Sequence, residues 1–205
     1  MLALTSFLTR NVRALLMLLS AGLLLSFLLV MSHAQGDERV LENQIPEHLP
    51  IRAKIKKDKE LSFKDMKNEK WVREFELEVK NTGDKPIYFL YLVLTFPEVN
   101  LHEGRRLMYP LVYGRTELGD IKTAATDEDI PIKPGETYVF KIHPSQVVAW
   151  EKSVRDEGRP QPHKAVLYFQ ILSFGNRTGY AGDTGVSLPH PVRSAAAGNL
   201  PARKN

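Results

Sequence analysis

Alternation of apolar and polar side chains is the strongest pattern in this chain, and it predicts a protein built mainly of β-strands. Residues 51–56 and 71–80 alternate with a period of two, which places apolar side chains on one face and charged ones on the other. In 71–80 the charged face carries Glu74, Glu76 and Glu78, as is typical of the solvent face of an antiparallel sheet. Similar reasoning predicts further strands at 107–113, 138–142 and 165–174.

Residues 87–96 are apolar on both sides, so this predicted strand needs a cover on each face. We expect the long connection 97–136 to fold over the second face, which includes Phe89 and Tyr91. Within that connection Pro110 restricts the predicted strand to a sheet edge. The competing hypothesis is that another protein provides the cover. The side chains expected to form the cover are Leu107, Tyr109, Leu111 and Tyr113. If another protein provides the cover, the possible interaction surface consists of Phe89, Tyr91, Tyr109 and Tyr113.

Short strands separated by Gly and Pro turns predict an all-β fold, an antiparallel immunoglobulin-like β-sandwich. One short helix is expected at 146–155, capped by Ser145 and burying Val147, Trp150 and Val154. The domain organisation expected from the pattern is a signal peptide or uncleaved anchor at 1–34, an extended lead-in at 35–50, the β-sandwich at 51–185 and a disordered tail at 186–205.

Three turn motifs resemble those of a known group of proteins. Asn-Thr-Gly-Asp-Lys-Pro-Ile-Tyr-Phe at 81–89 and Ile-Lys-Pro-Gly-Glu-Thr-Tyr at 132–138 are similar to strand connections of bacterial exported immunoglobulin-like domains. With Phe-Gly-Asn-Arg-Thr-Gly-Tyr at 174–180, they resemble a group of uncharacterised exported bacterial proteins, over residues 45–182. The resemblance implies a fold type. It implies no activity and no catalytic residues.

The N-terminal segment has the three parts of a secretory signal. Arg10 and Arg13 precede an apolar block at 14–31, and Ser32 and Ala34 supply the small residues of a signal-peptidase site. The alternative is an uncleaved anchor, because 18 residues of helix span roughly 27 Å, close to the thickness of a bilayer core. In both cases we expect the remainder to be exported to the periplasm or the extracellular space.

Charge and cysteine content remove several classes of function. Of 28 basic residues, two lie in the signal and three in the tail, which leaves 23 against 24 acidic residues and a net charge of −1 for 35–186. A nearly neutral domain is not expected to bind nucleic acid. The chain has no cysteine, hence no disulfide, thiolate metal site, thiol nucleophile or lipidated cysteine.

The glycine-rich segment 175–185 is the most site-like part of the sequence. Asn176, Thr178 and Asp183 offer oxygen atoms there, but one carboxylate and no alternating Asp pattern make a calcium loop a weak interpretation beside a flexible turn. The six histidines have no metal-ligand spacing, and the acids at 127–129 fit a solvated loop. No catalytic motif is present, and we expect no cofactor.

The sequence therefore favours a non-catalytic exported β-sandwich that binds a protein or another cell-envelope component. A carbohydrate-binding module, with a polysaccharide partner, is the first alternative, and exposed coplanar aromatic side chains would favour it. A small hydrolase with an unrecognised site is the second, and a cleft with converging His and acid side chains would favour it. Contact with the membrane is expected only through an uncleaved N-terminal segment.

Overall fold

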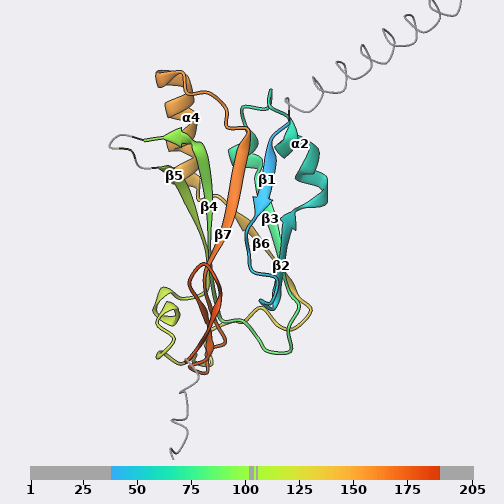
Figure 1. Cartoon of the computed structure of the whole chain (residues 1–205), viewed down its shortest axis with the longest axis vertical. Coiled ribbons are helices and arrows are strands. Elements are labelled where there is room, and N and C mark those ends of the chain that lie inside the picture. The colour runs from blue at the N-terminus through green and yellow to red at the C-terminus, as the bar shows by residue number, and fades with distance from the viewer. Residues whose placement is uncertain (1–37, 102–103, 105, 190–205) are drawn as a thin grey trace, which may run out of the picture. The chain divides into compact units, whose positions relative to one another are not determined.

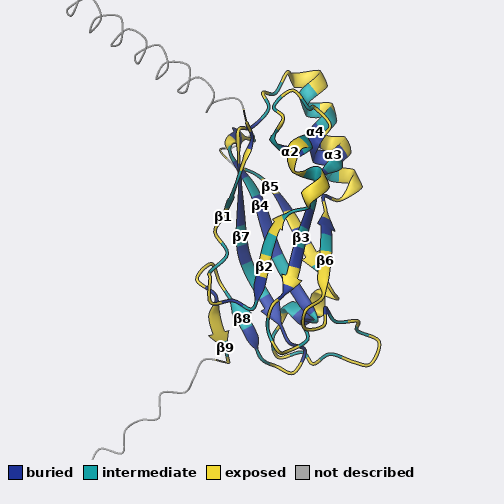
Figure 2. Cartoon of the chain, turned by 90° about the vertical axis from the view of Figure 1, so that its right-hand side faces the viewer, coloured by how far each residue is buried: buried dark blue, intermediate teal, exposed yellow. Residues whose placement is uncertain are grey.

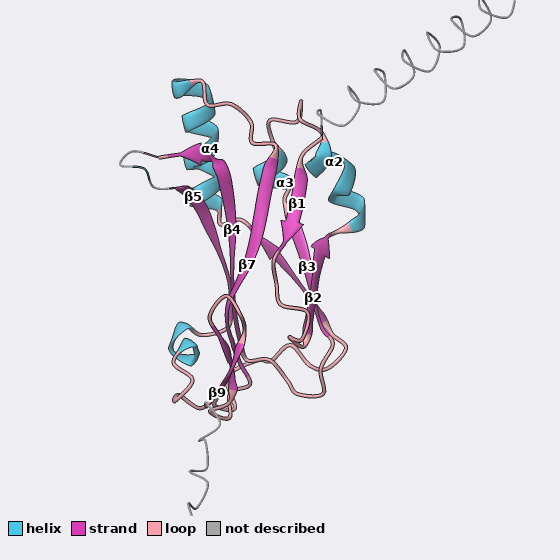
Figure 3. Cartoon of the chain, viewed as in Figure 1, coloured by secondary structure: helices cyan, strands magenta, loops and turns pink. Residues whose placement is uncertain are grey.

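The protein is a two-sheet sandwich with helices at one end (Figures 1 and 3). The computed structural model describes residues 38–101, 104 and 106–189, so the predicted signal and most of the predicted tail lie outside the described residues. The chain divides into units 1–38 and 39–205, and the sandwich belongs to the second unit. Its strands are β1 (Val40–Asn43), β2 (Ile51–Ile55), β3 (Glu76–Asn81), β4 (Phe89–Asn100), β5 (Arg106–Tyr113), β6 (Thr137–Lys141), β7 (Lys164–Ser173), β8 (Gly179–Ala181) and β9 (Val186–Leu188). The helices are α2 (Glu60–Lys64), α3 (Trp71–Glu74), α4 (Pro144–Glu157) and the 3₁₀ turns η1 (Lys57–Lys59) and η3 (Thr116–Gly119).

The smaller sheet, in the order β2-β3-β6, follows the predicted alternation closely. Leu77 and Val79 of β3 are fully buried, while Glu76, Glu78 and Lys80 between them point to the other face. Glu76 forms ion pairs with Lys56 at 2.8 Å and with Lys141 at 2.9 Å. Charged side chains thus cover the outer face of this sheet, as the sequence predicted.

The larger sheet has the order β5-β4-β7-β8-β9, with β1 also paired to β7. Its inner face carries Leu90, Leu92 and Leu94 of β4, all with 0% exposure, and these pack in the core with the smaller sheet. Figure 2 shows buried residues running along β4, β7 and β3. Strand β5 lies at the edge, as Pro110 predicted.

The pairing of β1 with β7 corrects the prediction of a purely antiparallel sandwich. β1 runs parallel to β7, with Val40 opposite Lys164 and Asn43 opposite Leu167. This strand lies in the segment expected to be an extended lead-in, and β9 lies in the segment expected to be a tail. Both are short edge additions of three or four residues with few buried side chains, so they carry little hydrophobic signal in the sequence.

The cover of β4 is partly as expected and partly different. Phe89 is 4% exposed, and a Cβ added to Gly119 would lie 3.1 Å from its ring, so η3 in the connection 97–136 does cover this residue. The side chains predicted to form the cover do not. Strand β5 pairs beside β4, with Leu111 opposite Leu92 and Tyr109 opposite Leu94, which puts both on the inner face. The prediction was wrong because β5 extends the sheet and does not lie over it.

Residues 71–74 are helical, and the predicted strand over 71–80 begins only at Glu76. In α3 both Trp71 and Val72 are 1% exposed, which a strand with one wet face does not allow. The charged segment before it also forms α2. The expectation of one short helix is therefore wrong: the described residues contain three α-helices, which gather at one end of the sandwich (Figure 2).

Helix α4 matches the predicted helix in place and buried face, but it begins earlier. Val147 and Trp150 are buried and Val154 is partly buried, as the spacing predicted. The N-cap is His143, with Pro144 in the first turn, so Ser145 is not the cap. The Ser145 backbone N–H donates to His143 Nδ1 at 3.3 Å, so the capping hydrogen bond is accepted by this ring nitrogen and not by the serine hydroxyl.

A buried arginine joins the start of the domain to the helical end. Arg39 has 0% exposure, and its guanidinium carbon lies 4.1 Å from the centroid of the Trp71 ring. Its Nε donates to the Pro162 carbonyl at 3.0 Å and one terminal nitrogen donates to the Phe63 carbonyl at 2.5 Å. Burial lowers the pKa of Arg39 to about 10, while the charge of Asp65 opposes that shift, so the group is charged at neutral pH. One cation therefore holds three separate segments.

Replacing Arg39 with Lys is expected to lower the free energy of unfolding by about 2 kcal/mol, because a lysine ammonium lacks the planar fork that reaches both carbonyls and stacks on the indole. Urea unfolding would measure this. Arg52→Lys is the matched control, since Arg52 is exposed and donates to nearby carbonyls of its own segment. Equal losses for the two variants would contradict the role given to Arg39.

The Glu76 ion pairs predict a dependence of stability on pH. Hydrogen bonds, chiefly from Lys56 and secondly from Lys141, lower the pKa of Glu76 from 4.5 to about 2. Because the folded pKa is depressed, this stabilisation is complete above pH 4.5 and is lost as the pH falls towards 2. Glu76→Gln is therefore expected to be less stable than wild type at pH 7, with a difference that closes between pH 4.5 and 2 in urea titrations. A difference that stays constant over this range would refute the ion-pair explanation.

Candidate functional site

A groove of about 400 Å³ separates the edge strand β5 from helix α4. Helix α4 contributes Gln146, Trp150 and Ser153, which are four and three residues apart and so share one face of the helix. The strand contributes Leu107, Met108 and Tyr109. The volume of the groove falls in the range of ligand pockets, about 300–1,000 Å³. The complete lining is Val99, Leu101, Leu107, Met108, Tyr109, Gln146, Ala149, Trp150, Ser153, Glu157 and Arg159.

Three of the residues that line this groove each have a buried polar atom without a hydrogen-bond partner among the described residues. These atoms are the Tyr109 hydroxyl, Gln146 Oε1 and Trp150 Nε1. In the described part of the chain the only other such side-chain atom is one terminal nitrogen of Arg39. A buried polar group left unsatisfied costs about 1–3 kcal/mol, so native proteins keep few of them. Their concentration at one groove makes it the strongest candidate site.

Core packing fixes the aromatic rings of this groove. The Tyr109 ring lies 5.5 Å from Phe96, and the Trp150 ring lies 6.1 Å from Trp71, both edge to face. Trp71, by contrast, has a satisfied indole, since its Nε1 donates to Gln161 Oε1 at 2.6 Å. The fold therefore gives one tryptophan a partner and leaves the neighbouring one without a partner in the described part of the chain.

The groove has two charged lining residues among the described ones, Glu157 and Arg159, and they form an ion pair with each other. Arg159 Nε donates to Glu157 at 2.9 Å, and Arg159 NH1 donates to the Asn100 carbonyl at 2.9 Å. Glu157 also accepts from the Ser153 hydroxyl at 3.2 Å. Burial raises the pKa of the Tyr109 phenol, so that group is neutral at physiological pH. The interior of the groove thus offers neutral donors and acceptors in an apolar surround.

The four residues predicted as a possible interaction surface do not form one surface. Phe89 lies under η3 and Tyr109 is 3% exposed on the inner face. Tyr91 is half-buried on the outer face of β4, opposite Ile171. Tyr113 packs against Tyr138 at 4.5 Å and donates its hydroxyl hydrogen to the Ile130 carbonyl at 2.7 Å. Of the four, only Tyr109 belongs to the groove.

The weak loop candidate is divided between two turns. Asn176 and Thr178 lie in the connection before β8, where Asn176 Oδ1 accepts from the Thr178 hydroxyl at 2.5 Å. Asp183 lies in the turn after β8. Packing and backbone conformation explain two glycines of this segment. A Cβ on Gly179 would lie 2.0 Å from the Leu172 carbonyl oxygen, and Gly175 has a φ of +69°, which favours glycine. The described residues contain no group of three His, Asp or Glu placed to hold a metal ion.

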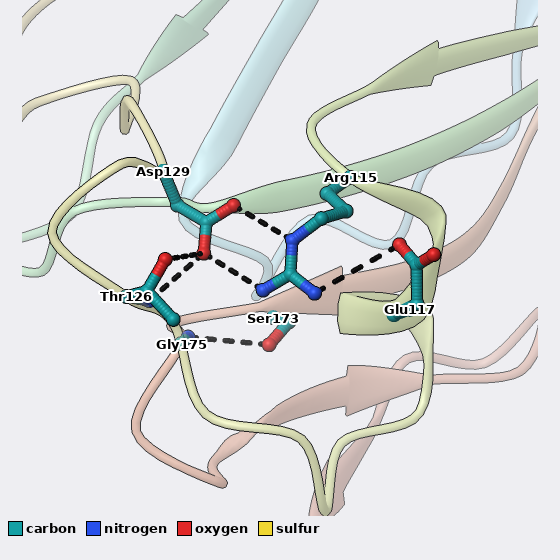
Figure 4. A network of polar contacts seen from close by, with 6 residues as sticks. All are labelled: Arg115, Glu117, Thr126, Asp129, Ser173 and Gly175. Atoms are coloured by element: carbon teal, nitrogen blue, oxygen red, sulfur yellow. Dashed lines mark hydrogen bonds and ion pairs between the residues drawn. The ribbon is translucent and has the colours of Figure 1, made fainter.

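The acidic loop at 127–129 is organised by one ion pair (Figure 4). Arg115 donates to both oxygens of Asp129, at 3.0 and 2.9 Å, and Asp129 also accepts from the backbone and hydroxyl of Thr126. Hydrogen bonds from Arg115 hold the pKa of Asp129 well below its usual range. This carboxylate therefore links Arg115 to Thr126 within the connection 97–136, and it is not a free acid or base.

A second hollow, of about 620 Å³, lies between η3 and the β8–β9 hairpin, lined by Ile121, Leu188 and Pro189 among others. It lies against the end of the described residues at 189 and contains none of the unpartnered polar atoms found in the described part. Of the helices in the described ranges, none has the length and hydropathy needed to cross a bilayer.

Sequence reasoning identified Tyr109 and Trp150 but did not place them together. Both residues were interpreted as core or cover, and both are buried. Gln146 was missed, because a glutamine on a short helix has no distinguishing pattern. The available signal was the apolar strand 107–113 followed by an amphipathic helix, which does not reveal whether buried polar atoms find partners.

No known family model, curated protein or solved structure matches this chain.

The close approach at Gly179 yields a stability prediction. Gly179→Ala is expected to lower the free energy of unfolding by about 3 kcal/mol, because the added methyl would overlap the Leu172 carbonyl and separate β7 from β8. Gly182→Ala is the control: its φ is +77° but nothing lies within 4 Å, so a loss of about 1 kcal/mol is expected from backbone strain alone. Thermal or urea unfolding would measure both, and a larger loss for Gly182→Ala would contradict the packing explanation.

Proposed function

We propose that this protein is a non-catalytic, exported, immunoglobulin-like β-sandwich that binds a protein or another component of the cell envelope, and that the groove between β5 and α4 is its binding site. The described residues form two facing, mostly antiparallel sheets, which supports the immunoglobulin-like assignment together with the turn motifs at 81–89 and 132–138. The charge and hydropathy pattern of residues 1–34 supports export.

The observation that carries the proposal is the cluster of three unpartnered buried polar atoms at one apolar groove. A binding pocket typically combines apolar walls with a few polar groups that orient a ligand. A structural core, by contrast, pairs its polar atoms or omits them. The unmet hydrogen bonds at Tyr109, Gln146 and Trp150 therefore favour a surface that is completed by a partner.

Filling the groove tests this function. Ala149 is exposed on α4 and lines the groove, whereas its neighbour Val148 is 59% exposed and does not line it. Ala149→Phe should reduce recovery of envelope partners by about tenfold, equivalent to losing roughly 1.4 kcal/mol of binding. Val148→Phe should leave recovery unchanged. The measurement is affinity purification of each full chain from cross-linked envelope fractions, with quantitative identification of what co-purifies.

Two results would overturn the proposal. In one, only the protein itself is recovered from the envelope fraction. In the other, the same components are recovered equally with wild type, Ala149→Phe and Val148→Phe. Thermal unfolding of the variants provides the folding control, and both are expected to unfold near the wild-type temperature because each site is on the exposed side of α4.

A further inference from the structure

We infer that the groove between β5 and α4 binds an extended peptide segment, with an apolar side chain against the groove walls and the backbone N–H and C=O of one residue completing the hydrogen bonds of Gln146 and Trp150. This inference rests on the proposed function, since it names the chemistry of the partner at the same site. It goes further by assigning a ligand class to three polar atoms.

The donors and acceptors at the groove match an amide. Trp150 Nε1 can only donate, so it requires an acceptor such as a carbonyl oxygen. Gln146 Oε1 can only accept, so it requires a donor such as an N–H. The Tyr109 hydroxyl can do either. A residue of an extended peptide carries one N–H and one C=O that point to the same side of its backbone, and it therefore supplies both of the complementary groups.

Charged ligands are disfavoured by the same inventory. Arg159 is the one cation that lines the groove within the described residues, and two of its three nitrogens already donate, one to Glu157 and one to the Asn100 carbonyl. An anionic ligand at Arg159 would lie close to the Glu157 carboxylate and would be repelled by its charge. A cationic ligand would compete with Arg159 for this carboxylate. The neutral interior leaves a neutral ligand as the better match.

A sugar is disfavoured because no ring face is open for stacking among the described residues of the groove. Trp150 and Tyr109 are each 3% exposed, and their rings pack edge to face on Trp71 and Phe96. Carbohydrate recognition by aromatic residues requires an exposed face.

The walls of the groove select an apolar side chain on the ligand. Leu107 is partly buried and Met108 is 54% exposed, and Ala149 leaves space opposite them on α4. Methionine is flexible and polarisable, which suits a surface that adapts to an aliphatic group. Burying one leucine-sized side chain contributes about 1.5–3 kcal/mol, enough to offset part of the cost of immobilising a short peptide.

The tryptophans provide a direct test. The chain has two, and their indole N–H groups differ, because Trp71 donates to Gln161 and Trp150 has no partner among the described residues. In protein labelled with ¹⁵N-tryptophan, two indole signals are expected. N-acetyl-L-leucine N-methylamide at millimolar concentration should move the Trp150 signal downfield, as a new hydrogen bond does, and leave the Trp71 signal in place.

Matched probes and variants isolate the amide. The ester analogue of this probe, 2-acetoxy-4-methyl-N-methylpentanamide, keeps the branched chain and both carbonyls but has an oxygen in place of the leucine N–H, so it should bind about fivefold more weakly, as expected for one lost hydrogen bond of about 1 kcal/mol. Gln146→Leu should weaken the amide probe about fivefold and leave the ester unchanged. Gln44→Leu, at an exposed glutamine bonded to Glu42, should change neither.

The inference is overturned if the Trp150 signal does not move, if amide and ester bind equally, or if methyl α-glucoside moves the signal and the amide does not. These failures are distinct from failure of the proposed function. Recovery of envelope partners that depends on the groove, together with an unmoved Trp150 signal, would leave the binding function standing and reject the peptide.

Discussion

The buried guanidinium of Arg39 is the interaction on which the helical end of this sandwich depends. The guanidinium donates hydrogen bonds to one carbonyl in α2 and to one in the segment before β7. The backbone N–H of Arg39 donates to the Lys64 carbonyl at 2.8 Å. A charge in this position would be costly without such partners, because desolvation penalises an unpaired ion strongly. Its face on Trp71 supplies further compensation, although one terminal nitrogen has no hydrogen-bond partner among the described residues. The result is that α2, α3, β1 and β7 converge on one side chain.

From Trp71 a chain of edge-to-face aromatic contacts leads to the candidate site. Trp71 contacts Phe96 at 5.4 Å, Phe96 contacts Tyr109 at 5.5 Å, and Trp71 also contacts Trp150 at 6.1 Å. Each such pair adds about 0.5–1.5 kcal/mol beyond area burial. The rings that contribute to the groove are therefore set by packing that begins at Arg39. Rigid positioning of polar groups by a core is what a binding site needs, because it limits the entropy lost when a ligand arrives.

The sequence predicted the parts of this structure that have a clear period, and failed where burial has another cause. β3 was recognisable because Leu77 and Val79 alternate with glutamates. Residues 71–74 were wrongly predicted as strand because Trp71 and Val72 are both buried by tertiary packing, which overrides a two-residue period. Arg39 carried no signal, since a single arginine in a polar segment has the pattern of a surface residue. The groove was unpredictable for a related reason: the sequence indicates that Tyr109 and Trp150 are buried, but not whether their polar atoms find partners.

The unpaired atoms of the groove are best understood as a cost that the fold retains. Phenylalanine at positions 109 and 150 would keep most of the ring packing without leaving a polar atom unsatisfied. The satisfied indole of Trp71, a few ångströms away, shows that this core can provide a partner where one is needed. Local departures of this kind from otherwise consistent packing are typical of functional sites. Their location supports this interpretation, because the residues that carry them line the groove between the edge strand β5 and the surface helix α4.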